Sequence, residues 1–451
     1  MVARCAFVFP GQGAYLPAVL ARLAVDEPLV EETLHLLDAA AVRLGRRAPS
    51  RLLLDERAPV LSELADEAPA DLHTALFAAE MVLFRILTQR HGLFPDVLLG
   101  HSFGELVALT AAGVYGLEDG MALVAARDEA FAACPPERGG MLALEMSASR
   151  AEGLLVGIGE WEVTLAADNS PRQCVVSGPA EPLGRVRLAA EVVGVRATAL
   201  RVPYAFHHRM LAAVAGDFTR RATALRAGPA RHLLHSAILG QRVDGTDAVA
   251  ELVAAHLVRR TRFTDAVRLL HAEGVEVFVE CGPRGVLSDL VTATVPDVRV
   301  VAPLRRRVSG PELSEALGGL TTFSTAVVVT GAGRAAAAVP RAGAETGTAA
   351  EEAVPGAEAL PDRRSVVATL RSLYAAALGY PPEVLTDDAD LEADLGVDSI
   401  KQTELFAQAA ARFGRALPAD GSRLTSYTTL DALAGLLRTL PMDGTHVGVP
   451  A

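Results

Sequence analysis

Short apolar runs, separated by longer helical stretches, set the pattern of the first three hundred residues. The runs at 6–9, 96–99 and 275–279 predict short buried strands, since continuous apolar runs of this length are typical of strands covered on both faces. Residues 14–92 and 103–112 carry patterns typical of helices, and each apolar run leads into a glycine-rich turn. The sequence therefore predicts an α/β body of the α/β-hydrolase-like kind.

A segment of different character, about residues 140–202, interrupts this body. Its pattern predicts the order strand, helix, strand, strand, helix, strand, which is typical of a small ferredoxin-like subdomain. The expected strands are 141–145, 163–167, 174–177 and 197–202, and the expected helices are 147–156 and 180–193. Long helices resume after it, so we expect the ferredoxin-like subdomain to be inserted into the larger one.

The composition changes after Arg307. Residues 309–361 are rich in Ala, Gly, Val, Pro and Thr and predict a linker. Beyond it, amphipathic helical patterns predict an all-α, four-helix-type bundle over 362–440, followed by a tail at 441–451. Residues 1–308 would then form the first domain.

Charge and cysteine content exclude several classes of protein. The formal net charge of −12 gives no support to nucleic-acid binding. The four cysteines lack paired spacing, the histidines lack metal-ligand spacing, and no apolar run is long enough to span a membrane. No secretory leader pattern opens the chain. We expect a cytoplasmic enzyme with buried thiols, no metal and no membrane contact.

The most informative stretch is Gly-His-Ser-Phe-Gly at 100–104, between a predicted strand and a predicted helix. A strand that turns sharply into a helix needs small residues on both sides, and Ser102 is then left exposed at the tip as a nucleophile. The helix N-terminus beside it favours a developing oxyanion. A chance glycine-serine turn is the alternative, and the flanking strand and helix favour the nucleophile.

Three stretches together resemble the malonyl-CoA:acyl-carrier-protein transacylase family, which includes the acyltransferase domains of polyketide synthases. They are Phe-Pro-Gly-Gln-Gly at 9–13, Gly-His-Ser-Phe-Gly-Glu at 100–105 and Tyr-Ala-Phe-His at 204–207. The resemblance covers about residues 5–307. In addition, Asp-Leu-Gly-Val-Asp-Ser-Ile-Lys at 394–401 resembles the phosphopantetheine attachment motif of acyl carrier proteins, in a form similar to polyunsaturated-fatty-acid and iterative polyketide synthases.

The resemblance implies a two-step acyl transfer through an ester on Ser102. His207 would be the general base, although His208 follows it where the family usually has serine, so a shift of one position stays open. The backbone N–H groups of Gln12 and Phe103 would form the oxyanion hole. A backbone carbonyl in the segment at His256 would orient the base, where other families use a carboxylate.

The family also implies a substrate pocket. Arg127, on the helix predicted over 117–133, would pair with the free carboxylate of a malonyl-type substrate, since a guanidinium matches a carboxylate with two parallel hydrogen bonds. An ordinary salt bridge with the adjacent acids is the alternative. The further pocket residues implied are His101, Asn169, Tyr204 and Phe206, and for Asn169 a structural turn is an equal alternative.

In the second domain, Ser399 begins a predicted helix and would carry covalent 4′-phosphopantetheine, since a helix N-terminus suits a phosphodiester. An ordinary Asp-Ser helix start is the alternative. The expected partners are a CoA thioester as substrate, acyl carrier proteins in cis or trans, a phosphopantetheinyl transferase and a ketosynthase-containing synthase. The acidic run at 383–398 is either a solvated loop or a docking face for basic partners.

The combined hypothesis is a malonyl-type acyltransferase joined to its carrier domain, in polyketide, antibiotic or fatty-acid biosynthesis. Two other hypotheses stay open: a serine acyl hydrolase with the same turn, which Arg127 and the carrier argue against, and a non-catalytic carrier module, which Ser102 and His207 argue against. No ketosynthase precedes the first strand, so we expect a free-standing protein or a fragment of a synthase.

Overall fold

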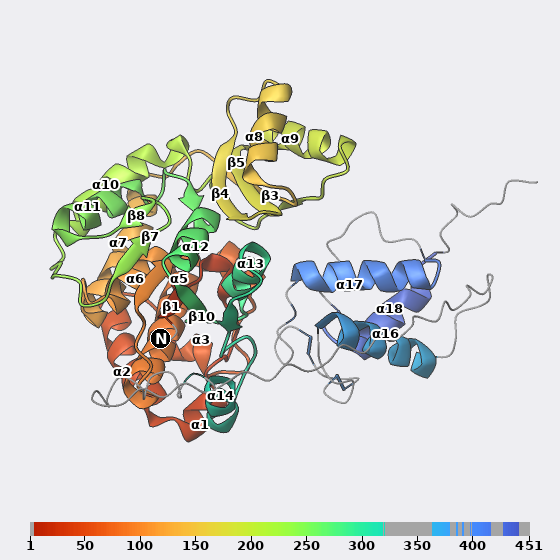
Figure 1. Cartoon of the computed structure of the whole chain (residues 1–451), viewed down its shortest axis with the longest axis horizontal. Coiled ribbons are helices and arrows are strands. Elements are labelled where there is room, and N and C mark those ends of the chain that lie inside the picture. The colour runs from red at the N-terminus through yellow and green to blue at the C-terminus, as the bar shows by residue number, and fades with distance from the viewer. Residues whose placement is uncertain are drawn as a thin grey trace, which may run out of the picture. The chain divides into compact units, whose positions relative to one another are not determined.

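The computed structural model describes residues 4–318, 320, 363–378, 385–386, 390–391, 397, 399–415 and 427–441. The chain divides into two compact units, Met1–Ser324 and Thr325–Ala451 (Figure 1). Most of the predicted linker, and half of the motif at 394–401, lie outside the described residues. Within the described part, no helix is long and apolar enough to cross a membrane.

A mostly parallel sheet forms the centre of the first unit. Its strand order is β11-β10-β1-β2-β7-β8, and only β8 runs antiparallel to its neighbour. β1 and β2 are central and buried, which explains why they appear in the sequence as unbroken apolar runs. The strands are β1 (Arg4–Phe9), β2 (Val97–Gly100), β7 (Leu234–Ser236), β8 (Gln241–Arg242), β10 (Val275–Glu280) and β11 (Arg299–Val301).

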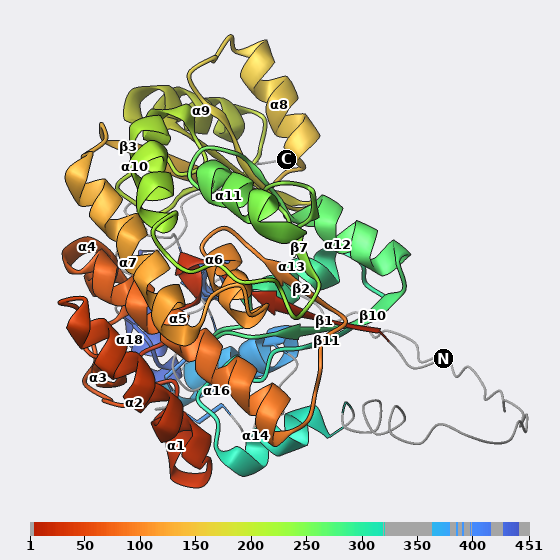
Figure 2. The same ribbon diagram turned by 90° about the vertical axis from the view of Figure 1, so that its left-hand side faces the viewer.

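Helices cover this sheet, as the two views show (Figures 1 and 2). α12 and α13 pack on one apolar face, where Val8 and Phe278 meet Phe263 and Val291. α5 is buried along almost its whole length and contacts α6 and α7. The helices are α1 (Leu23–Asp26), α2 (Pro28–Arg43), α3 (Ser50–Leu53), α4 (Leu61–Glu67), α5 (Pro69–Arg85), α6 (Gly104–Ala111), α7 (Leu117–Ala133), α10 (Ala212–Ala222), α11 (Gly245–Ala255), α12 (Phe263–Ala272), α13 (Val286–Thr294) and α14 (Gly310–Leu317).

The predicted ferredoxin-like subdomain is confirmed. Its elements follow the order strand, helix, strand, strand, helix, strand, and its sheet has the order β6-β3-β5-β4. A short strand from later in the chain, β9 (Thr261–Arg262), adds in parallel to β4 and joins the small sheet to the large subdomain. The elements are β3 (Gly139–Leu144), α8 (Ala148–Gly157), β4 (Thr164–Ser170), β5 (Gln173–Pro179), α9 (Ala180–Val192) and β6 (Ala197–Ala199).

The second unit is helical where it is described. α16 (Arg363–Leu378), α17 (Ser399–Arg412) and α18 (Leu430–Thr439) share one apolar core that contains Leu370, Phe406 and Leu433. The Thr429 hydroxyl caps α18 by accepting from the N–H of Ala432 at 3.2 Å. These contacts agree with the predicted all-α bundle.

Candidate active site

Ser102 lies at the sharp turn from β2 into α6 and has a φ of +53°. The flanking glycines are sterically required. A Cβ on Gly104 would lie 2.0 Å from the Phe9 carbonyl oxygen, and a Cβ on Gly100 would lie 2.4 Å from the Glu105 nitrogen. The end of β1 and the start of α6 lie too close to Gly100 and Gly104 to leave room for side chains there. The strained conformation therefore falls on Ser102 and presents its hydroxyl.

The turn is anchored on both sides. The N–H of His101 donates to the Phe9 oxygen at 2.9 Å, and the carboxyl of Glu105 accepts from the N–H of Ile238 at 2.9 Å. Burial raises the pKa of Glu105 to about 8, although hydrogen bonds from Ser236 and the backbone partly oppose the rise. At neutral pH this carboxyl is therefore mainly protonated, and it ties α6 to the segment after β7.

Ser102 and His207 are brought together from positions 105 residues apart. Ser102 Oγ lies 2.8 Å from His207 Nε2, and His207 Nδ1 lies 2.8 Å from the carbonyl oxygen of Arg259. A carbonyl only accepts, so Nδ1 carries the proton and Nε2 is left to accept from the serine. Burial lowers the pKa of His207 to about 4, partly offset by the Arg259 hydrogen bond, so the ring is neutral at pH 7.

The expectation for His256 was wrong by three residues. His256 follows the end of α11 in helical conformation, and its ring packs near Phe218 at a centroid distance of 6.0 Å. The chain turns after it, and the carbonyl that reaches His207 belongs to Arg259. Any residue type supplies a carbonyl, so the sequence held no signal that could fix its position.

The neighbouring His208 is used elsewhere. Its Nε2 lies 3.1 Å from the Glu162 carbonyl oxygen, and its Nδ1 accepts from the N–H of Met210 at 3.2 Å. One ring nitrogen therefore ties the loop at His208 to the small subdomain, and the other holds the loop itself. The geometry favours His207, and not His208, as the partner of Ser102.

Arg127 is a buried cation among aromatic rings. Its guanidinium carbon lies 5.9 Å, 5.4 Å and 5.2 Å from the ring centroids of Phe103, Phe131 and Phe206. Within the described part of the chain, Nε and Nη1 have no hydrogen-bond partner, and the Asp128 carboxylate is 3.6 Å from Nη1. Burial lowers the pKa of Arg127, and Asp128 partly opposes this. A buried guanidinium with unused donors is suited to bind an anion.

The aromatic residues beside Arg127 form one cluster. Phe131, one turn after Arg127 on α7, stacks on Tyr204 at 5.0 Å and contacts Phe206 edge-on at 5.6 Å. Phe131 was not predicted, although its spacing of four from Arg127 places both on one helix face. The structure thus brings the predicted Phe206 to the arginine and the predicted Tyr204 into the same aromatic cluster.

His101 and Asn169 are also brought together. His101 Nε2 lies 2.8 Å from Asn169 Oδ1, and the Asn169 amide donates to Gln173 Oε1 at 2.9 Å. Asn169 lies within β4, so the bond links the serine turn to the small subdomain. The His101 ring also meets Phe263 edge-on at 5.3 Å. Asn169 therefore contacts a residue adjacent to Ser102, which a turn role alone would not give.

Gln12 and Phe103 lie at the starts of two helical turns. Gln12 begins the short turn Gln12–Ala14, and Phe103 precedes α6 as its N-cap. Backbone N–H groups at such positions have no partner inside their own helix. The Gln12 side chain bonds to His73, and the Phe103 ring stacks on the same histidine at 5.4 Å. His73 was not predicted, and its partner Asp128 was considered only as an adjacent acid for a salt bridge with Arg127, a pair that is present at 3.6 Å.

Comparison with known protein families agrees with this site, which has a serine turn, a neutral histidine and a buried arginine. Residues 6–334 match the family described as the acyl transferase domain. The chain belongs to this family. Residues 368–437 match a second family, described as the phosphopantetheine attachment site. The chain therefore joins an acyl transferase domain to a carrier-type domain.

Curated relatives of the acyl transferase domain are large synthases. Polyketide synthase GfsA of Streptomyces halstedii is 35% identical over 291 residues, 64% of this chain and 4% of that protein. Spectinabilin polyketide synthase system protein NorB of Streptomyces orinoci is 38% identical over 289 residues, 63% of this chain and 13% of that protein. The chain thus spans a small part of these relatives.

Solved structures cover the same domain. The acyltransferase domain from the second module of the salinomycin polyketide synthase is 31% identical with a TM-score of 0.62, covering 70% of this chain and 73% of that one. Malonyl-CoA:acyl carrier protein transacylase from Xanthomonas oryzae is 28% identical with a TM-score of 0.63, covering 70% of this chain and 98% of that one. Both likenesses support the acyltransferase fold found here.

The residue predicted to carry the phosphopantetheine arm, Ser399, is described only in part. Ser399 is the first residue of α17, while the side chain of Ser399 and the residues at 392–396 and 398 lie outside the described part. Gln402, on the first turn, donates to the Val397 carbonyl oxygen at 3.1 Å and holds the approach to the helix. A helix start at this position fits a phosphodiester.

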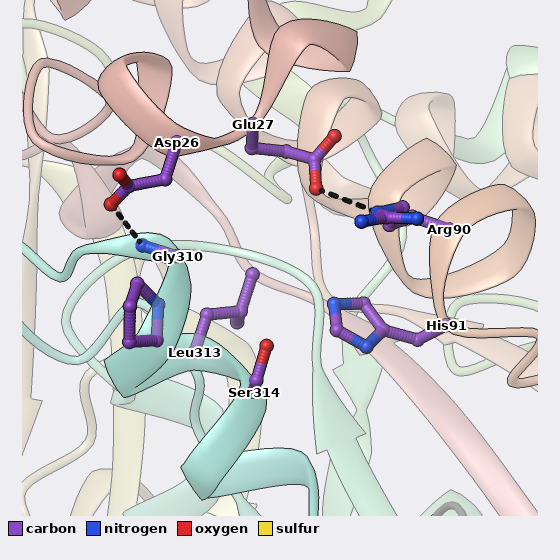
Figure 3. Close-up of a pocket in the computed structure, with 8 residues that line it drawn as sticks. Asp26, Glu27, Arg90, His91, Gly310, Leu313 and Ser314 are labelled. Atoms are coloured by element: carbon purple, nitrogen blue, oxygen red, sulfur yellow. Dashed lines mark hydrogen bonds and ion pairs between the residues drawn. The ribbon is translucent and has the colours of Figure 1, made fainter.

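A separate pocket of about 440 Å³ lies between the start of α2, the segment after α5 and the start of α14 (Figure 3). Glu27 pairs with Arg90 at 3.5 Å, and Asp26 accepts from the N–H of Gly310 at 3.1 Å. None of the residues singled out for chemistry lines this pocket. It therefore contributes nothing to the site at Ser102.

Proposed function

We propose that the chain transfers a malonyl-type acyl group from CoA, through an ester on Ser102, to the thiol of an acyl carrier protein. The observation that carries this proposal is the His207 ring between Ser102 Oγ and the Arg259 carbonyl, with 2.8 Å at each contact. Such an arrangement activates a hydroxyl without a carboxylate. The family match over 6–334 supports the same chemistry.

In the first half-reaction, His207 Nε2 takes the proton of Ser102 Oγ as the oxygen attacks the thioester carbonyl carbon. The carbonyl oxygen becomes negatively charged, and the N–H groups of Gln12 and Phe103 stabilise it. The carbon–sulfur bond then breaks, and His207 returns its proton to the departing CoA sulfur. Ser102 is left as an ester and His207 as the neutral base.

In the second half-reaction, a carrier's 4′-phosphopantetheine supplies the acceptor thiol. His207 Nε2 takes the proton of that thiol, and Gln12 and Phe103 again stabilise the oxyanion. When the ester bond breaks, His207 returns the proton to Ser102 Oγ. On this proposal Ser399 holds the arm of this chain's own carrier domain, and carriers in trans are also possible acceptors.

Arg127 supports a substrate with a free carboxylate. Its unused donors lie in a buried aromatic surrounding, where a carboxylate would be bound by two charge-assisted hydrogen bonds. An acetyl group would leave the guanidinium without that partner. The phenyl ring of Phe206 narrows the space beside the arginine and favours malonyl over methylmalonyl, by roughly 1–3 kcal/mol for one methyl group.

The proposal assigns residues 1–308 to the acyltransferase domain, 309–361 to the linker and 362–440 to the carrier domain. The division into units at 324 and 325 and the two family matches support this order. The expected partners are a phosphopantetheinyl transferase, which would modify Ser399, and a synthase that contains a ketosynthase.

The choice of acyl acceptor separates a transferase from a hydrolase. The full chain is treated with a phosphopantetheinyl transferase and CoA, freed of CoA, mixed with malonyl-CoA, and followed by intact mass and by malonate release. Transfer predicts malonyl on the carrier arm and little free malonate, and Ser399→Ala should abolish the arm. Release of malonate as the main product, with no acyl group on any carrier, would make the chain a hydrolase.

A further inference from the structure

His73 contacts both residues that supply the proposed oxyanion hole. It lies on α5 and is buried. Its Nε2 bonds to the side-chain amide of Gln12, and its ring stacks on Phe103 with centroids 5.4 Å apart and planes 24° apart. Its Nδ1 lies 2.7 Å from Asp128 Oδ1. One side chain therefore joins three segments that are distant in the sequence.

The hydrogen bonds of His73 have a definite direction. The carboxylate of Asp128 accepts, so His73 Nδ1 carries the ring proton. Burial lowers the pKa of His73, an effect that Asp128 partly opposes and Arg127 and Arg46 reinforce, so the ring is neutral and Nε2 accepts. The Gln12 amide must then donate to it. Gln12 therefore donates to His73, and His73 donates to Asp128.

Asp128 connects this chain of bonds to the substrate arginine. Asp128 Oδ1, which accepts from His73, lies 3.6 Å from Arg127 Nη1. The side chain of Asp128 is 9% exposed and that of Arg127 is 3% exposed, so solvent screens this pair little. The same carboxylate thus faces the histidine behind the oxyanion hole and the cation expected to bind the acyl carboxylate.

We propose that His73 is a positioning residue that holds Gln12 and Phe103 at the separation needed to bind the oxyanion. It acts through the Gln12 side chain on one donor and through ring stacking on the other. Asp128 fixes the ring so that both contacts are made at once. This inference rests on the proposed function, because it assigns a role within that acyl transfer.

The size of the effect follows from the geometry that oxyanion binding demands. Removal of one oxyanion-hole donor typically costs about 10²–10³-fold in rate, and a displacement of about 1 Å can cost about 10²-fold. His73 does not touch the substrate, so its loss should displace donors rather than remove them. We therefore expect a decrease of about 10–10²-fold in the acylation rate constant.

Three substitutions at His73 separate its contacts. His73→Phe retains a ring of similar size against Phe103 and removes both polar contacts. His73→Gln places an amide oxygen near the position of Nε2 and can still accept from Gln12. His73→Asn places an amide N–H near the position of Nδ1 and can donate to Asp128, but it does not reach Gln12.

The experiment is single-turnover acylation of the full chain by malonyl-CoA, with the rate constant at saturation and the half-saturating concentration measured separately. His73→Phe and His73→Asn should lower the rate constant about 10–10²-fold with a half-saturating concentration within about threefold of wild type. His73→Gln should recover most of the rate. Thermal unfolding of each variant shows whether it is folded. If His73→Phe does not fold, the comparison of His73→Gln with His73→Asn still tests the role of the Gln12 contact.

Three results would overturn the inference. The variants could acylate at the wild-type rate, the loss could fall on the half-saturating concentration alone, or Gln and Asn could give equal rates. The first denies any role, the second places His73 in substrate binding, and the third denies that the Gln12 contact matters. If wild type forms no ester on Ser102, the proposed function itself fails, and that result is distinct from all three.

Discussion

His207 donates its Nδ1 proton to the main-chain carbonyl of Arg259, at 2.8 Å. The orienting group of the base is therefore backbone, and its position depends on the turn after α11 and not on a side chain. The Arg259 side chain is exposed and pairs with Glu251 at the surface. A change of the Arg259 side chain therefore leaves the orienting carbonyl in place.

Arg259→Ala should leave acylation nearly unchanged. The carbonyl remains in place, and an exposed ion pair contributes only about 0–1 kcal/mol. His207→Ala should slow acylation by about 10²–10⁴-fold, the usual contribution of a positioned general base. Single-turnover rates of the two variants provide the comparison. A loss in Arg259→Ala as large as that in His207→Ala would show that the side chain, and not the carbonyl, orients the base.

Arg127→Ala should reverse the preference for a dicarboxylic acyl group. Loss of one member of a buried charge pair costs about 2 kcal/mol or more, so malonyl acylation should fall at least about 30-fold. Acetyl acylation should be unchanged or improved, since no cation is then left without a partner. Competition between malonyl-CoA and acetyl-CoA, measured by the mass of the acylated chain, tests this. Arg220→Ala, at an exposed arginine, is the matched control. Preferential acetyl loading by wild type would contradict the assignment.

Gly104→Ala and Gly184→Ala should change stability in opposite directions. A Cβ at Gly104 would lie 2.0 Å from the Phe9 oxygen, so that substitution should destabilise the fold by about 1–3 kcal/mol or more. Gly184 lies within α9 with nothing within 4 Å of the added atom, so alanine there should stabilise by about 0.5–1 kcal/mol. Urea unfolding of both variants measures the difference. A Gly104→Ala protein of wild-type stability would show that the turn is not as closely packed as described.

The protein should lose stability as the pH rises toward 8. Burial raises the pKa of Glu105 to about 8 and that of Glu280 to about 7, from an ordinary value of 4.5. The folded state therefore binds more protons than the unfolded chain between pH 4.5 and 8. The two protonated carboxyls stabilise the folded state fully below about pH 4.5. This stabilisation decreases as the pH rises through 7 and 8.

The free energy of unfolding is measured with denaturant at about pH 5.5, 7 and 8.5, because these values bracket the raised pKa values. Glu105→Gln keeps an amide in place of the protonated carboxyl and should flatten the decline. On the acidic side, His207, with its pKa lowered to about 4, contributes stability that is lost as the pH falls from 6.5 toward 4. A Glu105→Gln protein with an unchanged pH dependence would exclude Glu105 as the source.

Local constraints explain which features could be predicted. The turn at Ser102 was predictable because its sterics lie within a few residues, from Gly100 to Gly104. The small subdomain was predictable because its strands and helices follow one another without long excursions. Both features need little knowledge of distant contacts.

The missed residues are brought to the site by tertiary packing. His73 lies on a helix that is buried on all sides, so its position among buried residues carried no periodic signal. Asp128 and Phe131 share the predicted helix with Arg127, but the neighbours they meet depend on the packing of α7 against α5 and α10. The Arg259 carbonyl has no side-chain signature at all. Such contacts follow only from the folded chain.

The site of acylation tests most directly whether Ser102 is the nucleophile. The full chain is mixed briefly with malonyl-CoA, quenched in acid, digested and mapped by mass spectrometry, with Ser102→Ala as the matched variant. If Ser102 is the nucleophile, a malonyl ester is expected on the peptide that contains Ser102 and is absent from Ser102→Ala, although that variant remains folded. An acyl group that persists on the first unit of Ser102→Ala, or a wild-type chain acylated only elsewhere, would contradict it.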